Sequence, residues 1–426
     1  MIRTVTVIGA SGTMGSKVAA IFASFGGAKI YCVGRDKKKI ERMLPRMVGS
    51  VRADCIFPNL IPADYTVLDR CVAESDLVFE SVSERMDLKA DIVTRVCRTL
   101  RSGAYFCTGT SGLSITSLAE RCPEELRERF FGVHFFNPPY SMSLCELIPT
   151  RYSDPAATGA LVDYLENVLL RTVVKVKDAP AFLANRIGFQ FINRCLQLSE
   201  KWKDNGGIDY IDAIFGPFTG RAMPPLATSD YVGLDVHKAI VDNIWQNTGD
   251  YAHDTFVFPE FAVNLIREGN LGRKSGRGLY IVDKTQRLVY DIKAQRYREV
   301  RPYVFSFVET MKTCISEGDY ENALRELMNN QSMEADICRT LLLDYIVYGL
   351  YAAREVVGNL SAADDVMADG FNWCPPIAWF GALSSVADVR GRLRERIRSL
   401  PASAQAERLF SGDLCSKYDY RRFLKV

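Results

Sequence analysis

The chain has 426 residues and a mass of 47.8 kDa, which at about 150 residues per domain predicts two or three domains with sizeable cores. Its 53 Lys and Arg against 51 Asp and Glu leave a formal charge of +2, so neither nucleic acid nor an anionic membrane is expected as a partner. Hydrophobic residues at 48% and charged residues at 24% exclude disordered, collagen-like and disulfide-scaffold classes.

Cysteine usage indicates a reducing compartment. The 12 cysteines are scattered, with no CxxC pair and no Cys/His cluster at zinc spacing, so we predict no metal site. The chain opens on strand-like residues 4–8 in place of a charged and then apolar leader. No apolar run reaches the roughly 18 residues of a membrane span. We therefore expect reduced thiols, a cytoplasmic location and no membrane association.

The first part of the chain alternates short apolar runs with segments whose apolar residues recur at helical spacing. This alternation predicts an α/β domain over residues 1–178, with a doubly wound sheet covered by helices on both faces. Strands are expected at 4–8, 29–33, 76–80, 104–107, 130–136 and 144–148, and helices at 13–25, 36–46, 85–101 and 114–121.

A glycine-rich loop joins the first strand to the first helix. Glycines there let a backbone approach a pyrophosphate, and the following helix supplies oriented N–H groups. The spacing Gly-x-x-Gly-x-x-Gly is one residue longer than the common dinucleotide motif, and an ordinary glycine turn is the alternative. The strand, loop and helix together predict a Rossmann-type cofactor site formed by Gly9, Ser11, Gly12, Thr13, Met14 and Gly15.

The end of the second strand bears on cofactor choice. An NAD site usually has an acidic residue there, for the ribose 2′-OH, but this chain has Gly34 followed by Arg35. An arginine can pair with a 2′-phosphate, so the cofactor is NAD or NADP with a slight preference for NADP. In the alternative, Asp36 replaces the acid and residues 37–39 form a solvated helix face.

His134 and Glu146 stand on two neighbouring apolar segments. A turn over residues 137–143 would bring the two strands side by side and set the imidazole against the carboxylate. Such a pair can act as a base with an orienting acid at neutral pH. Ser111 follows the strand at 104–107, where ligand crevices form, although a helix-capping role for this region is an alternative.

Beyond residue 178 the pattern becomes helical. Pro180 could open a long helix to about residue 203, and further helices are expected at 208–215, 233–247 and 257–267 in a domain spanning 179–283. A second helical domain is expected over 284–426. A long helix, then acidic residues, then two prolines occur in both domains, ending at Pro224-Pro225 and Pro375-Pro376. This order suggests a divergent repeat, with shared helical geometry as the alternative.

Several ordered segments carry a family resemblance that runs from residue 4 to about 283. They are Gly9–Gly15, Leu77–Glu80 with Glu84 and Lys89, Thr110-Ser111, Gly132–Pro138 (GVHFFNP), Leu144–Glu146, Lys177–Arg186 (KDAPAFLANR), Asp230–Asp235 and Leu271–Tyr280 (LGRKSGRGLY). The chain resembles the L-3-hydroxyacyl-CoA dehydrogenases. The resemblance implies a reversible hydride transfer between a nicotinamide cofactor and C3 of a (3S)-3-hydroxyacyl-CoA.

Carried over residue by residue, the resemblance implies that His134 is the general base and Glu146 its partner. Ser111 and Asn185 would hold the substrate oxygen, and Glu84 and Lys89 would contact the nicotinamide side. Lys38, within the basic run 37–39, and Arg42 would meet the adenylate end of CoA. Longer members of the family carry two helical repeats packed on each other, which implies a monomer whose internal pseudo-symmetric contact replaces a subunit interface.

Several residues depart from the family pattern, among them Ser11, Gly34, Gly109, Gly112 and Ala181. The segments Asn137–Tyr140 and Leu147–Pro149 also resemble the λ-crystallin/L-gulonate dehydrogenase branch. Two alternatives follow: a dehydrogenase of a non-CoA 3-hydroxy or sugar acid, and a dinucleotide-binding protein without turnover. The apolar segment 341–351 is expected to be buried against the first helical domain.

Overall fold

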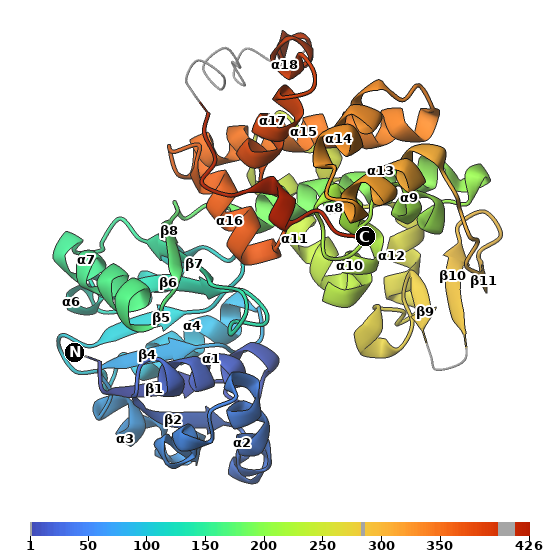
Figure 1. Cartoon of the computed structure of the whole chain (residues 1–426). Coiled ribbons are helices and arrows are strands. Elements are labelled where there is room, and N and C mark those ends of the chain that lie inside the picture. The colour runs from blue at the N-terminus through green and yellow to red at the C-terminus, as the bar shows by residue number, and fades with distance from the viewer. Residues whose placement is uncertain (1, 283–285, 399–413) are drawn as a thin grey trace. The chain divides into compact units, whose positions relative to one another are not determined.

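The computed structural model describes residues 2–282, 286–398 and 414–426. The chain divides into two compact units, Met1–Phe182 and Leu183–Val426 (Figure 1). The boundary expected at 283/284 lies outside the described residues.

The first unit is built on an eight-stranded sheet of order β3-β2-β1-β4-β5-β6-β7-β8. All neighbours are parallel except β6 and β7, which pair antiparallel. The predicted doubly wound α/β fold is confirmed. The strands are β1 (Thr4–Ile8), β2 (Lys29–Gly34), β3 (Leu60–Asp64), β4 (Leu77–Glu80), β5 (Tyr105–Thr108), β6 (Phe130–Phe135), β7 (Leu144–Pro149) and β8 (Thr172–Lys175).

Helices pack against this sheet. They are α1 (Thr13–Ser24), α2 (Lys37–Val51), α3 (Leu68–Ala73), α4 (Met86–Val96), α5 (Ile115–Ala119), α6 (Glu124–Arg127) and α7 (Pro155–Asp163). The sequence patterns did not predict β3, α3, α6, α7 and β8. All of them except α7 have six residues or fewer. In addition, β3 carries Pro62 and ends in Asp64, residues that are rare in strand interiors.

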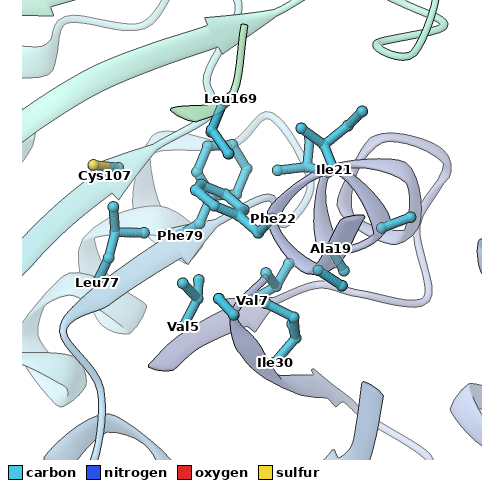
Figure 2. Packing of buried hydrophobic residues seen from close by; sticks show 14 of the residues in the cluster. Val5, Val7, Ala19, Ile21, Phe22, Ile30, Leu77, Phe79, Cys107 and Leu169 are labelled. Atoms are coloured by element: carbon cyan, nitrogen blue, oxygen red, sulfur yellow. The ribbon is translucent and has the colours of Figure 1, made fainter. Parts of the chain in front are cut away.

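Apolar side chains of β1 and α1 form the centre of the first unit's core. Val5 and Val7 are fully buried on β1, and Phe22 projects from α1 between Phe79 and Leu169 (Figure 2). The Phe22 ring lies 6.1 Å from Phe79 and 6.3 Å from Phe135 between centroids. This packing fixes α1, and with it the glycine loop that precedes it, against the sheet.

The second unit is mostly helical. Its helices are α8 (Ala184–Lys201), α9 (Ile208–Ile214), α10 (Pro225–Val232), α11 (Leu234–Asn247), α12 (Glu260–Arg267), α13 (Ser306–Ser316), α14 (Tyr320–Asn329), α15 (Met333–Val356), α16 (Ala362–Phe371), α17 (Pro376–Ser384) and α18 (Val389–Arg398). A small antiparallel sheet has the order β11-β10-β9, with β9 (Tyr280–Val282), β10 (Arg287–Asp291) and β11 (Arg296–Glu299).

Two local expectations for this unit were wrong. The long helix does not open at Pro180, because Ala181 and Phe182 have left-handed φ values of 59° and 55°, and α8 begins at Ala184. The segment after residue 284 is not entirely helical, since β10 and β11 extend the sheet begun by β9. These strands have only five and four residues, so they are too short to show a clear apolar alternation.

The same helix–helix connection, which we call a corner, occurs twice in the second unit: an aspartate of one helix caps the start of a following helix. Asp212 of α9 accepts hydrogen bonds from the N–H groups of Leu226 and Ala227, at 2.8 and 3.0 Å, in the first turn of α10. Asp364 of α16 accepts from the N–H of Ile377, at 2.7 Å, in the first turn of α17. In both, a buried carboxylate satisfies N–H groups that a helix start leaves free.

Helices from the C-terminal part of the chain, α15 and α16, pack against α8. The expected burial of 341–351 is confirmed, since every residue there except Asp344 is buried. On α16, the Phe371 ring sits against Gly188, where a Cβ would lie 2.4 Å from two ring carbons. Gly188 therefore permits the close approach of α16 to α8.

Gly188→Ala tests this approach. Overpacking a close contact costs ~1–3 kcal/mol, whereas alanine in a helix interior gains only ~0.5–1 kcal/mol over glycine. We expect a net loss of roughly 1 kcal/mol in the free energy of unfolding, measured by urea denaturation. The matched control is Gly381→Ala on α17, where nothing lies within 4 Å of the new Cβ and stability should rise. Equal effects of both variants would contradict the packing.

Candidate active site

The glycine loop is built so that its backbone folds tightly over the end of β1. Gly9 has a left-handed φ of 85°, and a Cβ there would meet the Ser81 carbonyl oxygen at 2.3 Å. A Cβ at Gly15 would meet the Gly9 carbonyl oxygen at 2.4 Å. Gly12 precedes α1 and provides no side-chain cap for it. The loop can therefore bring the free N–H groups of α1 close to a pyrophosphate.

The additional loop residue, Ser11, lies beside the end of β2. A Cβ at Gly34 would stand 3.4 Å from the Ser11 Oγ and 2.9 Å from a methyl of Ile40, so this corner has little room for an acidic side chain. Arg35 is exposed at the same strand end. The Asp36 carboxylate accepts from the N–H groups of Lys38 and Lys39, at 2.9 and 3.3 Å, and so caps α2.

His134 and Glu146 face each other across the antiparallel pair β6 and β7. They are register partners, and His134 Nδ1 lies 2.9 Å from Glu146 Oε2, so the predicted contact is confirmed. His134 is 6% exposed and Glu146 is fully buried. The imidazole also lies 4.5 Å from the Phe136 ring and 5.7 Å from the Phe182 ring. The hydrogen bond between the carboxylate and the imidazole therefore lies in apolar surroundings, where it is stronger than it would be in water.

Lys89 of α4 lies between two carboxylates, those of Glu80 at the end of β4 and of Glu84 just before α4. Its ammonium donates to both Glu80 oxygens, at 2.9 and 3.0 Å, and lies 3.4 Å from Glu84 Oε2. Lys89 is 1% exposed and Glu80 fully buried, whereas Glu84 is partly open to solvent. Glu80 was not predicted as part of the site, because a lone acid in a strand pattern gives no indication of its partner.

Glu84 connects this cluster to the loop that carries Ser111. Its Oε1 accepts from the Ser111 N–H at 2.9 Å and from the Thr110 hydroxyl. The register partner of Thr108 on β5 is Gly132 on β6, two residues before His134. Ser111, which follows β5, and His134, near the end of β6, therefore lie at the same edge of the sheet, where ligand crevices form in such sheets.

Asp178 holds the other end of the Ser111 loop. Its carboxylate accepts from the Ser114 hydroxyl and the Ile115 N–H, both at 3.0 Å, and from the Thr116 N–H at 2.8 Å. It thereby caps the start of α5 from 62–64 positions away in the chain. Asp178 lies within the resemblance motif Lys177–Arg186, but its capping role was not predicted, since such a distant cap leaves no local pattern.

Two cations fasten the loop between His134 and Glu146. Lys17 of α1 donates to the Asn137 amide oxygen at 2.6 Å, so it links the cofactor-loop helix to the end of β6. Arg171, which is buried, donates to the carbonyl oxygens of Pro139 at 2.5 Å and Leu169 at 2.7 Å. Burial lowers the pKa of Arg171. The loop that connects the His134 strand to the Glu146 strand is therefore held in place at both Asn137 and Pro139.

Asn185 belongs to the second unit. It is the second residue of α8 and is 7% exposed. Lys38 lies exposed on the first turn of α2, beside Lys37 and Lys39. Among the described residues, no group of three or more His, Cys, Asp or Glu side chains could hold a metal ion. Within the same residues, no helix combines the length and the apolarity needed to cross a membrane.

Two domain models of one protein family match consecutive parts of the chain. The 3-hydroxyacyl-CoA dehydrogenase NAD binding domain matches residues 4–179, and the C-terminal domain of the same family matches residues 182–282. Rat mitochondrial hydroxyacyl-coenzyme A dehydrogenase is 31% identical over 294 residues, which cover 66% of this chain and 91% of the relative.

Two further comparisons extend into the C-terminal part. A probable 3-hydroxyacyl-CoA dehydrogenase of Bacillus subtilis is 26% identical over 403 residues, or 87% of this chain, and this chain spans 50% of that protein. The crystal structure of 3-hydroxybutyryl-CoA dehydrogenase from Escherichia coli matches with a TM-score of 0.69 at 21% identity, over 97% of each chain. That match shows a shared fold across nearly the whole length.

Because Lys89 and Glu80 are both buried, removing the charge of Lys89 should greatly lower the stability of the fold. Lys89→Met would leave Glu80 as a buried carboxylate without its counter-charge, which typically costs ~3–5 kcal/mol. We expect a loss of that order in the free energy of unfolding by urea denaturation followed by circular dichroism. The matched control is Lys38→Met, an exposed lysine whose loss should change stability by no more than ~0.5 kcal/mol. Equal stability of the two variants would contradict the cluster's importance.

Proposed function

Because the chain belongs to the 3-hydroxyacyl-CoA dehydrogenase family, we propose that it transfers a hydride reversibly between a nicotinamide cofactor and C3 of a (3S)-3-hydroxyacyl-CoA. The observation that carries this proposal is the buried pair of His134 and Glu146 beside the carboxyl ends of the parallel strands. An imidazole held by a carboxylate is suited to accepting a hydroxyl proton near neutral pH.

The geometry supports a separate role for each ring nitrogen of His134. The Glu146 carboxylate accepts a hydrogen bond from Nδ1 of His134, which favours the tautomer protonated at Nδ1. Nε2 is then the basic atom of the ring. In oxidation Nε2 takes the proton of the 3-hydroxyl. A nicotinamide cofactor held at the glycine loop would supply the hydride acceptor. The Glu146 charge stabilises the imidazolium that results. In reduction the same nitrogen returns the proton to the substrate oxygen.

The remaining site residues act by holding groups in place. Ser111 and Asn185 hold the substrate oxygen, and Glu84 and Lys89 contribute to the nicotinamide side. Gly9, Ser11, Gly12, Thr13, Met14 and Gly15 hold the pyrophosphate, a role supported by the tight backbone at Gly9 and Gly15. Lys38 and its neighbours attract the adenylate end of CoA, supported by their exposure on α2.

We further propose that the cofactor site accepts NADP(H). Position 34 is a glycine and not an acidic residue. Ser11 and Ile40 pack so closely against Gly34 that an acidic side chain would have little room there. Asp36 caps α2, which favours Arg35 over Asp36 as the group that meets the ribose. A guanidinium there can form a charged hydrogen bond with a 2′-phosphate.

The fold supports two proposals about the protein's setting. Because α15 covers α8 within one chain, we propose that the helical part is two divergent repeats and that the protein works as a monomer. The paired corners at Asp212 and Asp364 support the repeat. All 12 cysteines are free, which supports a reducing compartment such as the cytoplasm.

His134→Ala tests the base. General-base catalysis contributes ~10²–10⁴-fold, so kcat for acetoacetyl-CoA reduction, followed at the nicotinamide absorbance, should fall by about that factor. Cofactor affinity should barely change. Glu146→Gln should lower kcat in the same direction, since it keeps the size of the side chain and removes the charge. A His134→Ala enzyme within a few-fold of wild type would overturn the assignment.

Arg35→Ala tests the cofactor proposal. One charged hydrogen bond contributes ~1.5–3 kcal/mol, which corresponds to roughly tenfold or more in affinity. We expect kcat/KM for NADPH to fall by about that factor while the value for NADH stays unchanged or rises. Lys38→Ala is the matched control, expected to raise KM for the acyl-CoA and leave the cofactor ratio alone. Strict NADH dependence in both wild type and Arg35→Ala would refute the proposal.

A further inference from the structure

The first turn of α8 contains a closed triangle of buried polar groups. Arg186, next to Asn185, donates from Nε and Nη2 to Asp250 Oδ2 at 3.2 and 2.7 Å. Its Nε also lies 3.1 Å from the Tyr348 hydroxyl, which in turn donates to Asp250 Oδ2 at 2.7 Å. Each of the three groups is therefore bonded to the other two.

The triangle is deeply buried, so its bonds are difficult to replace by water. Arg186 and Asp250 are each 6% exposed and Tyr348 is 1% exposed. A buried ion pair needs additional hydrogen bonds to offset the desolvation of its charges. The Tyr348 hydroxyl supplies two of these bonds, one as acceptor and one as donor.

Tyr348 comes from a distant part of the chain. It lies on α15, 162 residues after Arg186, beyond residue 282 where the match to the family's C-terminal domain ends. One turn after Asn185, α8 meets another C-terminal group, the Phe371 ring against Gly188. The turn of α8 that carries Asn185 is therefore held by helices outside the matched domains.

We propose that Tyr348 is a positioning residue for the active site, acting through Arg186 to fix the first turn of α8 and hence the Asn185 side chain. This inference rests on the role proposed above for Asn185 in holding the substrate oxygen. It gives the C-terminal helices a part in the chemistry although they carry none of the proposed catalytic residues. A shift of about 1 Å in a group that orients substrate lowers rates substantially.

The test compares two tyrosines of the same helix. Tyr348→Phe removes the hydroxyl from the triangle and keeps the ring. The matched control is Tyr345→Phe, an equally buried tyrosine of α15 whose hydroxyl bonds the Cys374 carbonyl oxygen at 3.2 Å. With acetoacetyl-CoA and the preferred reduced cofactor, we expect Tyr348→Phe to lower kcat/KM for the acyl-CoA by about three- to tenfold. KM for the cofactor should not change, and Tyr345→Phe should stay within twofold of wild type.

A double-mutant cycle separates positioning from general destabilisation. In an Asn185→Ala background, Tyr348→Phe should have no further effect on kcat/KM, because its route to the substrate is already lost. Equal losses in both backgrounds, or equal losses from Tyr345→Phe and Tyr348→Phe, would overturn the proposal.

Hydrogen–deuterium exchange of the full chain makes the outcome independent of turnover. Tyr348→Phe should speed exchange in a peptide covering residues 183–190, and Tyr345→Phe should not. If wild type does not turn over acetoacetyl-CoA, the proposed function fails while exchange still decides whether Tyr348 holds the turn. Unchanged exchange in Tyr348→Phe would overturn the inference even in an active enzyme.

Discussion

The antiparallel pairing of β6 with β7 is the constraint on which the rest of the site depends. It sets His134 directly opposite Glu146, and a slip of one residue would move the carboxylate to the other face of the sheet. Flanking residues such as Val133 and Leu147 are buried on both strands, so the two polar side chains face each other within an apolar pair of strands. The loop that closes this pair is fastened in turn by Lys17 and Arg171.

Around this pair, the first unit satisfies buried charges with partners from distant segments. Lys89 stands between Glu80 and Glu84, and Glu84 reaches the backbone of Ser111. Asp178 then fixes the helix that follows. A buried charge is costly without such partners, so each of these contacts also restricts the loops at the sheet edge. Stability and site geometry thus rest on the same groups.

The second unit uses the same principle at helix ends. Asp212 and Asp364 each hold the start of a following helix, and Asp250 joins Arg186 to Tyr348. The contact of Arg186 with Tyr348 ties α8 to α15, 162 residues later in the chain. The long C-terminal part therefore forms one hydrophobic and polar core with the first helical segment, in agreement with its single compact unit.

The sequence by itself determined the α/β fold, the glycine loop and the contact of His134 with Glu146, because each follows from local periodicity or from two strands joined by a short turn. It could not show that Glu80 would neutralise Lys89, that Asp178 would cap α5, or that Tyr348 would meet Arg186. Those pairs join residues 9, 63 and 162 positions apart, in contacts that follow no local repeat. Only tertiary packing brings such groups together, since the cost of burying one charge is offset wherever the fold supplies its partner.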